Sequence, residues 1–181
     1  GNAVVLIDTG PVPALPVAGD AHAGCLSFEF SSANNRLVVN CGVSPRSNPL
    51  WRKVSRSTAA HSTLTVEDTS SCRFLSERPF GRLLGTPILS GPTDVPMERE
   101  DDMAGSRITA SHDGYATDFN IIHERDLRLS GDGTVLDGID TMRALGAIEA
   151  EHRYALRFHL YPGLRTSLLR GGSAVLMVCR D

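Results

Sequence analysis

Two histidines and an asparagine stand at the borders of three successive strand-like segments, where they could bind a metal ion. His22 precedes the first segment, Asn40 ends the second and His61 opens the third. Neighbouring strands lie about 4.8 Å apart, so side chains at matching strand ends can converge on one point. Neutral imidazoles are good zinc ligands, whereas an amide oxygen is a weaker third ligand than a carboxylate or thiolate. The residues alone leave two roles open for the histidines: structural hydrogen bonding, or metal binding and catalysis.

His112 and Tyr115 form a second group that could do acid–base chemistry. A histidine and a tyrosine close together can act as base and acid when a proton is abstracted beside a carboxylate. The two residues lie three positions apart around Gly114, where local hydrogen bonding is the alternative, and Tyr115 could also contact a sugar. His123 and His159 each lie beside an arginine in a strand-like segment, and we expect both on a solvated polar face.

Trp51, the only tryptophan, is followed by Arg52 and Lys53. An aromatic ring can stack on the C–H groups of a pyranose, and an arginine can bind a carboxylate through two parallel hydrogen bonds. These residues could therefore form a binding surface for an acidic sugar. The alternative is that Trp51 anchors a core or a corner between sheets.

The elements that must position these residues are β-strands. Apolar residues alternate with polar ones in residues 25–30 and 154–160, and this period of two predicts strands with one buried face. Further strands are expected at 4–7, 36–40, 61–67, 108–111, 121–129, 134–140, 165–169 and 174–179. Glycine- and asparagine-rich turns at 34–35, 130–133 and 171–172 are typical of hairpins. The sequence therefore predicts one all-β domain over residues 1–181.

Two stretches break the alternation. Residues 77–105 contain four prolines and the acidic run 98–102, and we expect them to form a long excursion at the edge of the sheets. Residues 142–152 could form a short helix.

Composition argues against several functions. The 18 basic and 21 acidic residues are interspersed and give a net charge of −3, so no basic face is expected for nucleic acid or a membrane surface. No apolar run approaches the roughly 20 residues that span a bilayer. The first residues lack a secretion signal and run into a strand, so we expect a piece of a longer protein. That protein would be periplasmic if it carries a signal peptide and cytoplasmic otherwise.

Three segments resemble the signature of the heparinase II/III-like polysaccharide lyases. The family pattern is His-x-His-x-Asp-x-Leu-Ser-Phe, then a strand ending in Val-Asp-x-Gly, then Arg-Ser-Thr-x-x-His-Asn/Ser-Thr. Residues 20–28 here are Asp-Ala-His-Ala-Gly-Cys-Leu-Ser-Phe, residues 39–42 are Val-Asn-Cys-Gly, and residues 56–63 are Arg-Ser-Thr-Ala-Ala-His-Ser-Thr. Weaker similarity continues through 112–115, 123–125 and 157–163.

The resemblance implies that His22 and His61 are two of three zinc ligands, with Asn40 in place of the third, an aspartate. It also places Asp20 where active members carry a histidine that reaches toward the substrate, and Gly24 where the motif has an aspartate. Replacing Asp by Asn removes a negative charge from the site of a dication, which weakens metal binding. We expect either a weak zinc site or a metal-free, hydrogen-bonded one.

The resemblance further implies an antiparallel β-sandwich of the kind found C-terminal to an (α/α) toroid, in a lyase that cleaves uronate polysaccharides by β-elimination. Heparin-type glycosaminoglycans, alginate-type and other uronate polymers all fall within it. The principal base and acid would lie on the upstream toroid, so this chain would not suffice for catalysis. Two alternatives are a non-catalytic carbohydrate-binding or scaffolding module, and a free-standing metal-dependent enzyme built on His22 and His61.

Overall fold

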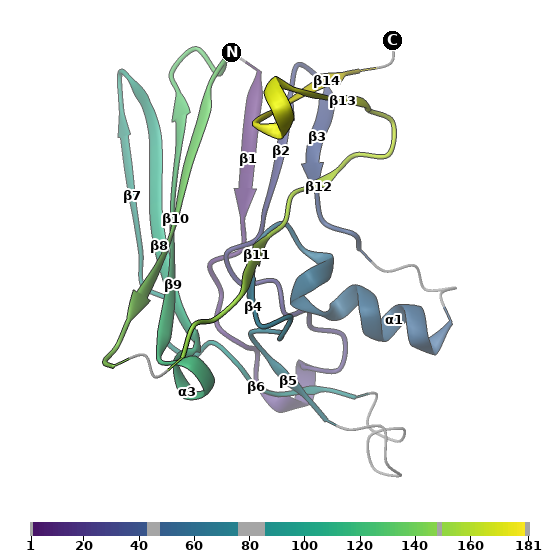
Figure 1. Cartoon of the computed structure of the whole chain (residues 1–181), viewed down its shortest axis with the longest axis vertical. Coiled ribbons are helices and arrows are strands. Elements are labelled where there is room, and N and C mark those ends of the chain that lie inside the picture. Colours follow the sequence, from purple (N-terminus) through teal and green to yellow (C-terminus); the bar gives the residue numbers. More distant parts are fainter. Residues whose placement is uncertain (1, 43–47, 76–85, 148–149, 180–181) are drawn as a thin grey trace.

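The structure, a computed structural model, describes residues 2–42, 48–75, 86–147 and 150–179. Antiparallel strands form two main sheets that stand side by side (Figure 1). The N-terminal sheet has the strand order β1 (Ala3–Ile7), β2 (Phe28–Ser32), β3 (Asn35–Val39), β12 (His159–Leu160). The central sheet has the order β10 (Leu136–Ala144), β9 (Ile121–Ser130), β8 (Gly105–Tyr115), β7 (Met97–Asp102).

Apolar side chains from the two sheets meet in a shared core. Phe28 and Val38 of the N-terminal sheet pack with Leu127 of the central sheet, and all three are buried. Burying a Val, Leu or Phe side chain stabilises a fold by about 1.5–3 kcal/mol, so this contact holds the layers together. The arrangement confirms the predicted antiparallel β-sandwich.

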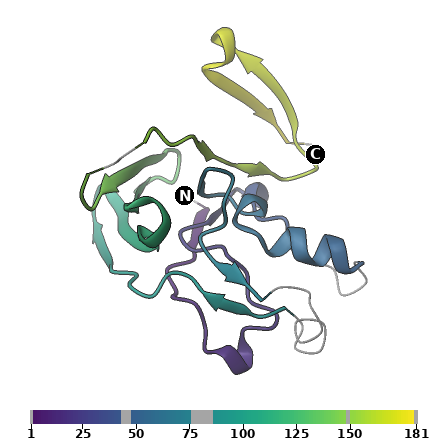
Figure 2. The ribbon, with the colours of Figure 1, turned by 60° about the horizontal axis from the view of Figure 1, so that its bottom comes forward.

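Shorter elements flank the two sheets. Three strand pairs are β4 (Leu64–Val66) with β11 (Tyr154–Leu156), β5 (Arg73–Phe74) with β6 (Ile88–Ser90), and β13 (Arg165–Leu169) with β14 (Ala174–Val178). The helices are α1 (Pro49–Arg56), α3 (Ala116–Phe119) and the 3-10 turns η1 (Leu15–Val17), η2 (Thr58–Ala60) and η3 (Arg170–Gly172). The β13–β14 hairpin stands away from the sheets (Figure 2). No helix in the described ranges is long and apolar enough to cross a membrane.

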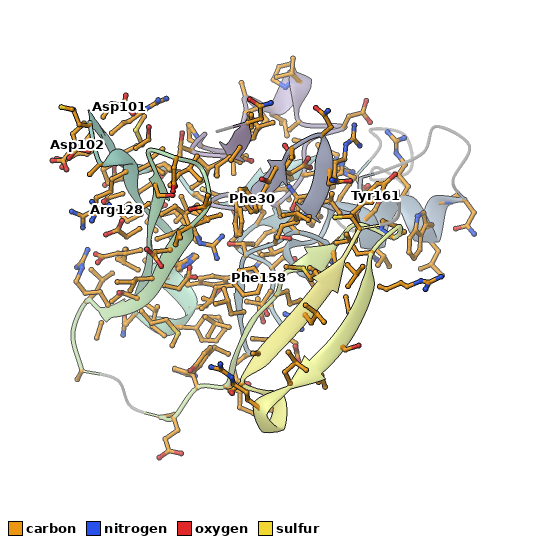
Figure 3. All side chains as sticks on the ribbon, turned by 90° about the horizontal axis from the view of Figure 1, so that it is seen from above. Phe30, Asp101, Asp102, Arg128, Phe158 and Tyr161 are labelled. Atoms are coloured by element: carbon orange, nitrogen blue, oxygen red, sulfur yellow. The ribbon has the colours of Figure 1, made fainter. Side chains whose placement is uncertain are left out.

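The central sheet has one face toward the shared core and one face away from it, and the strand register shows which residues share each face. Ala110, Arg125 and Asp140 stand opposite one another on β8, β9 and β10, and their side chains share the inward face with Leu127. Arg128 belongs to the opposite face, on the side away from Phe30 (Figure 3). The inward face therefore joins an apolar half to a polar half that contains a buried arginine.

Alternation in the sequence located many of the strands, and the structure corrects the two stretches that break this alternation. The strands expected at 4–7, 36–40, 121–129, 165–169 and 174–179 are confirmed with ends shifted by about one residue. The acidic run 98–102 lies at the edge of a sheet, as expected, but it belongs to a regular strand, β7, whose exposed charges disfavour pairing with another chain. The helix expected at 142–152 is wrong, since Met142 to Ala144 continue β10. Residues 76–85 and 148–149 lie outside the described part.

The strands expected at 25–30 and 61–67 each begin three residues later than predicted. Leu26 has a φ of +58°, and its N–H donates to the Asp8 carbonyl at 2.7 Å, so the chain turns there and β2 starts at Phe28. His61 follows the turn η2, and β4 starts at Leu64. Both histidines of the motif thus lie on loops next to strands.

Helix α1 was not predicted, although its start carries a recognisable signal. The Asn48 side chain accepts a hydrogen bond from the Trp51 backbone N–H at 2.8 Å, and Pro49 occupies the first turn. An asparagine cap followed by proline is typical of helix N-termini.

Arg125 makes a testable contribution to stability. Its guanidinium is buried and paired with Asp140, with Nε 2.8 Å from Oδ1. Arg125→Met leaves the Asp140 carboxylate without its cationic partner, which costs about 3 kcal/mol of unfolding free energy. Urea denaturation measures the loss, and Arg128→Met on the outward face, changed by less than about 0.5 kcal/mol, is the control. Equal effects of the two substitutions would contradict the assignment.

Candidate functional site

Two loop segments carry the histidine pair, and Arg56 at the end of α1 fixes one of them. His22 lies between η1 and β2, and His61 follows η2. The Arg56 carbonyl accepts from the Ala23 N–H at 2.9 Å, and the Arg56 guanidinium donates from Nε to the Ala21 carbonyl at 2.8 Å. The residues on both sides of His22 are therefore tied to the helix end.

His22 and His61 form a direct hydrogen bond whose direction follows from their surroundings. His61 Nδ1 lies 2.8 Å from the Ser57 carbonyl oxygen, which only accepts, so Nδ1 carries the proton. His61 Nε2 is then the acceptor, and His22 Nδ1 donates to it across 3.0 Å. Burial is the main cause that lowers the pKa of each ring, and the charge of Arg56 adds to it for His22. Both imidazoles are neutral at pH 7.

Asn40 lies beside this pair with both ends of its amide engaged. Its Oδ1 accepts from the Ser62 N–H at 2.8 Å, directly after His61 in the chain. Its Nδ2 donates to Ser27 Oγ at 3.4 Å. The structure thus brings together the three residues that the sequence put forward as metal ligands.

The donor set of this cluster does not fit a zinc site with a full set of ligands. Zinc normally takes four ligands. Here the two imidazole nitrogens are hydrogen-bonded to each other, and the Asn40 amide oxygen accepts a hydrogen bond from the Ser62 backbone N–H. Within the described residues, no group of three or more His, Cys, Asp or Glu side chains is arranged to hold a metal ion.

Asp20 and Arg52 form an exposed ion pair next to the histidine loop, and Trp51 precedes Arg52 on α1. Arg52 on α1 forms an ion pair with Asp20, whose side chain is 83% exposed. Trp51 is 53% exposed, so it does not anchor a core. The binding role that the sequence suggested for Trp51 and Arg52 stays a prediction.

His112 and Tyr115 are buried and satisfied by other groups. The Tyr115 hydroxyl donates to the Leu64 carbonyl at 2.9 Å, and His112 Nδ1 accepts from the Gly114 N–H at 3.0 Å. Both side chains are at most 1% exposed. The arrangement favours local hydrogen bonding over direct contact with a substrate.

His123 does not lie on a solvated face, contrary to the expectation. It is fully buried, because it shares the inward face of β9 with Arg125. His112 Nε2 donates to His123 Nδ1 across 3.3 Å, and His123 Nε2 donates to Asp140 Oδ1 at 2.7 Å. His159 is half-buried and donates from Nε2 to the Ala59 carbonyl at 2.9 Å.

Sequence reasoning missed Arg125, which connects this network to the candidate site. Its Nη1 donates to the Leu26 carbonyl at 2.6 Å and to the Ser62 carbonyl at 2.9 Å. Asp140, its acidic partner, was missed as well. The sequence did indicate that Arg125 is buried, because it lies two residues before the apolar Leu127 on β9, and residues two apart on a strand share a face.

Comparison with known proteins shows one family over the whole chain and one fold like it. The sequence profile of the family described as "Heparinase II/III-like, C-terminal" matches residues 1–181. The fold matches the crystal structure of a mutant of the heparan sulfate lyase HepC from Pedobacter heparinus with a TM-score of 0.72 and 17% identity, over 99% of this chain and 24% of the lyase chain.

A curated relative covers the same region. The "FtsZ-localized protein C" of Caulobacter vibrioides is 34% identical over 184 residues, which include 98% of this chain. The aligned region is 31% of that protein, so the chain spans about a third of the relative's length.

The buried histidines make stability depend on pH. Burial lowers the pKa of His112 to about 3, so the unfolded chain, with an ordinary histidine pKa of about 6.5, takes up a proton that the folded chain does not. Stability is therefore full above about pH 6.5 and falls as the pH drops toward 3, by about 2 kcal/mol at pH 5 for this one group. Urea denaturation at pH 7.5 and pH 5 measures the loss.

His112→Gln is the matched variant, since it keeps a donor toward His123. It reduces the difference between the two pH values by about 2 kcal/mol, whatever its effect on stability at pH 7.5. An unchanged difference would show that His112 takes up its proton equally in both states.

Proposed function

Because the chain belongs to the heparinase II/III-like C-terminal family, we propose that it is the β-sandwich of a polysaccharide lyase acting on uronate-containing polymers. The observation that carries the proposal is the family match over all of residues 1–181. The aligned region is about a third of the curated relative's length, which agrees with a larger parent protein. In this proposal an upstream helical toroid supplies the principal base and acid, and the sandwich alone does not turn over substrate.

The sandwich would contribute substrate binding at the exposed surface beside His22. Trp51 stacks on a pyranose ring, and Arg52 binds the uronate carboxylate whose negative charge increases when the neighbouring proton is removed. Asp20 holds Arg52 through their ion pair and keeps the guanidinium at this surface. Elimination breaks the C–O bond at the adjacent carbon, leaving a carbon–carbon double bond, and the leaving oxygen takes a proton from the acid.

A second candidate is a module that binds or scaffolds without cleaving. Asp20, Gly24 and Asn40 stand at positions where the family motif has histidine or aspartate, and the Caulobacter relative is named for its localisation with FtsZ. This candidate and the lyase differ in one product, the unsaturated uronate end.

The experiment is to incubate the full-length parent protein with heparin, heparan sulfate and alginate and to follow ultraviolet absorbance. The lyase proposal predicts that absorbance from unsaturated uronate rises with at least one polymer, and that the 181-residue chain alone gives none. Binding of a polymer without unsaturated ends would support the scaffolding module instead. Neither binding nor cleavage of any uronate polymer would overturn both.

Variants of the parent protein test the binding surface. Trp51→Ala and Arg52→Ala are each expected to raise KM for the cleaved polymer roughly tenfold, about 1.4 kcal/mol, because each removes a contact made with bound sugar. Leu50→Ala, on the same helix and also exposed, is the control with unchanged kinetics. Equal behaviour of all three would place the sugar elsewhere.

A further inference from the structure

We propose that the Asn40 amide keeps the His22–His61 pair free of metal at the close approach that Gly24 allows, and that a single substitution, Asn40→Asp, converts the pair into a zinc site. The proposal concerns the chemistry of four residues of this chain. It does not depend on the parent protein being a lyase.

The hydrogen bond between the two imidazoles uses the nitrogens that a shared metal would need. Zinc–nitrogen bonds of 2.0–2.1 Å at a tetrahedral angle place two ligand nitrogens about 3.3 Å apart. His22 Nδ1 and His61 Nε2 are 3.0 Å apart, within the usual range of a hydrogen bond from nitrogen. The lone pair of His61 Nε2 is occupied by the proton of His22. Metal binding would require His22 to change tautomer and the rings to separate.

Gly24 makes this close approach of the imidazoles possible. A Cβ atom at position 24 would lie 2.9 Å from His61 Cδ2 and 3.3 Å from His61 Nε2. The His61 ring cannot easily move away, because it is 4% exposed and held by the Ser57 carbonyl. Any side chain here would therefore displace His61 from His22. The family motif has an aspartate at this position, so the glycine is a departure with a structural consequence.

The Asn40 amide is neutral and so lacks the negative charge that favours binding of a dication. The same Cβ position above Gly24 would lie 3.2 Å from Ser27 Oγ, so Ser27 and His61 border one small space. The Asn40 Nδ2 group donates to that Ser27 oxygen, so the end of the amide nearest this space is a donor and not a ligand. The Asn40 oxygen is turned toward the Ser62 N–H.

Asn40→Asp should fit the same position without disturbing its neighbours. One carboxylate oxygen keeps the hydrogen bond from the Ser62 N–H, and the second replaces Nδ2 beside Ser27, whose hydroxyl can rotate to donate. The second oxygen brings an anionic ligand to the edge of the histidine pair. The charge favours a dication over the shared proton, and zinc then takes the place of the His22–His61 hydrogen bond.

The test is zinc titration of the 181-residue chain after removal of metal by a chelator, followed by calorimetry and thermal denaturation. The unaltered chain is expected to bind no stoichiometric zinc and to melt at the same temperature with or without it. Asn40→Asp is expected to bind one zinc ion, on the order of 10- to 100-fold more tightly than the unaltered chain binds zinc. The melting temperature of Asn40→Asp is expected to rise when zinc is added. Adding His61→Gln to Asn40→Asp abolishes both effects.

Asn35→Asp is the matched control, because it makes the same charge change at the first residue of β3, whereas Asn40 directly follows the last one. Tight stoichiometric zinc binding by the unaltered chain would overturn the proposal, even if Asn40→Asp failed to fold. Zinc binding by Asn40→Asp no tighter than by Asn35→Asp would show that position 40 does not decide metal binding. Lyase activity of the parent protein affects neither outcome.

Discussion

The buried guanidinium of Arg125 is the interaction on which the geometry of the candidate site depends. A charge inside a core must be paired and hydrogen-bonded, because leaving it unsatisfied costs several kcal/mol. Arg125 meets this demand with the Asp140 carboxylate on one side and the Leu26 and Ser62 carbonyls on the other. Leu26 and Ser62 belong to the two motif segments that carry the histidines. The central sheet therefore fixes both segments through one side chain.

Ser62 is the point at which these constraints meet. Its carbonyl accepts from Arg125, its N–H donates to Asn40, and its hydroxyl donates to the Val39 carbonyl while accepting from the His159 N–H. The N-terminal sheet, the central sheet and the loop of His61 are thus joined at one residue. The histidine pair gains its fixed geometry from this support.

Much of this could be predicted from the sequence, and the remainder has identifiable physical reasons. Alternation located most strands, and the motif identified His22, His61 and Asn40, which the fold brings together. The sequence pattern did not show which face of the sheet His123 occupies, because the charged residues next to it suggested an exposed position. His123 and Leu127 lie an even number of residues apart on β9, so their side chains share the buried face. The hydrogen bond from Arg125 to the Ser62 carbonyl depends on how the sheets pack, and the residues around either position do not indicate it.

The most direct test of the central claim is nitrogen NMR of the chain labelled with nitrogen-15 at histidine and purified without a chelator. The account predicts a measurable scalar coupling between His22 Nδ1 and His61 Nε2 across their hydrogen bond. It also predicts that His61 carries its proton on Nδ1. Absence of the coupling, with both nitrogens shifted to values typical of metal-bound imidazole, would contradict it.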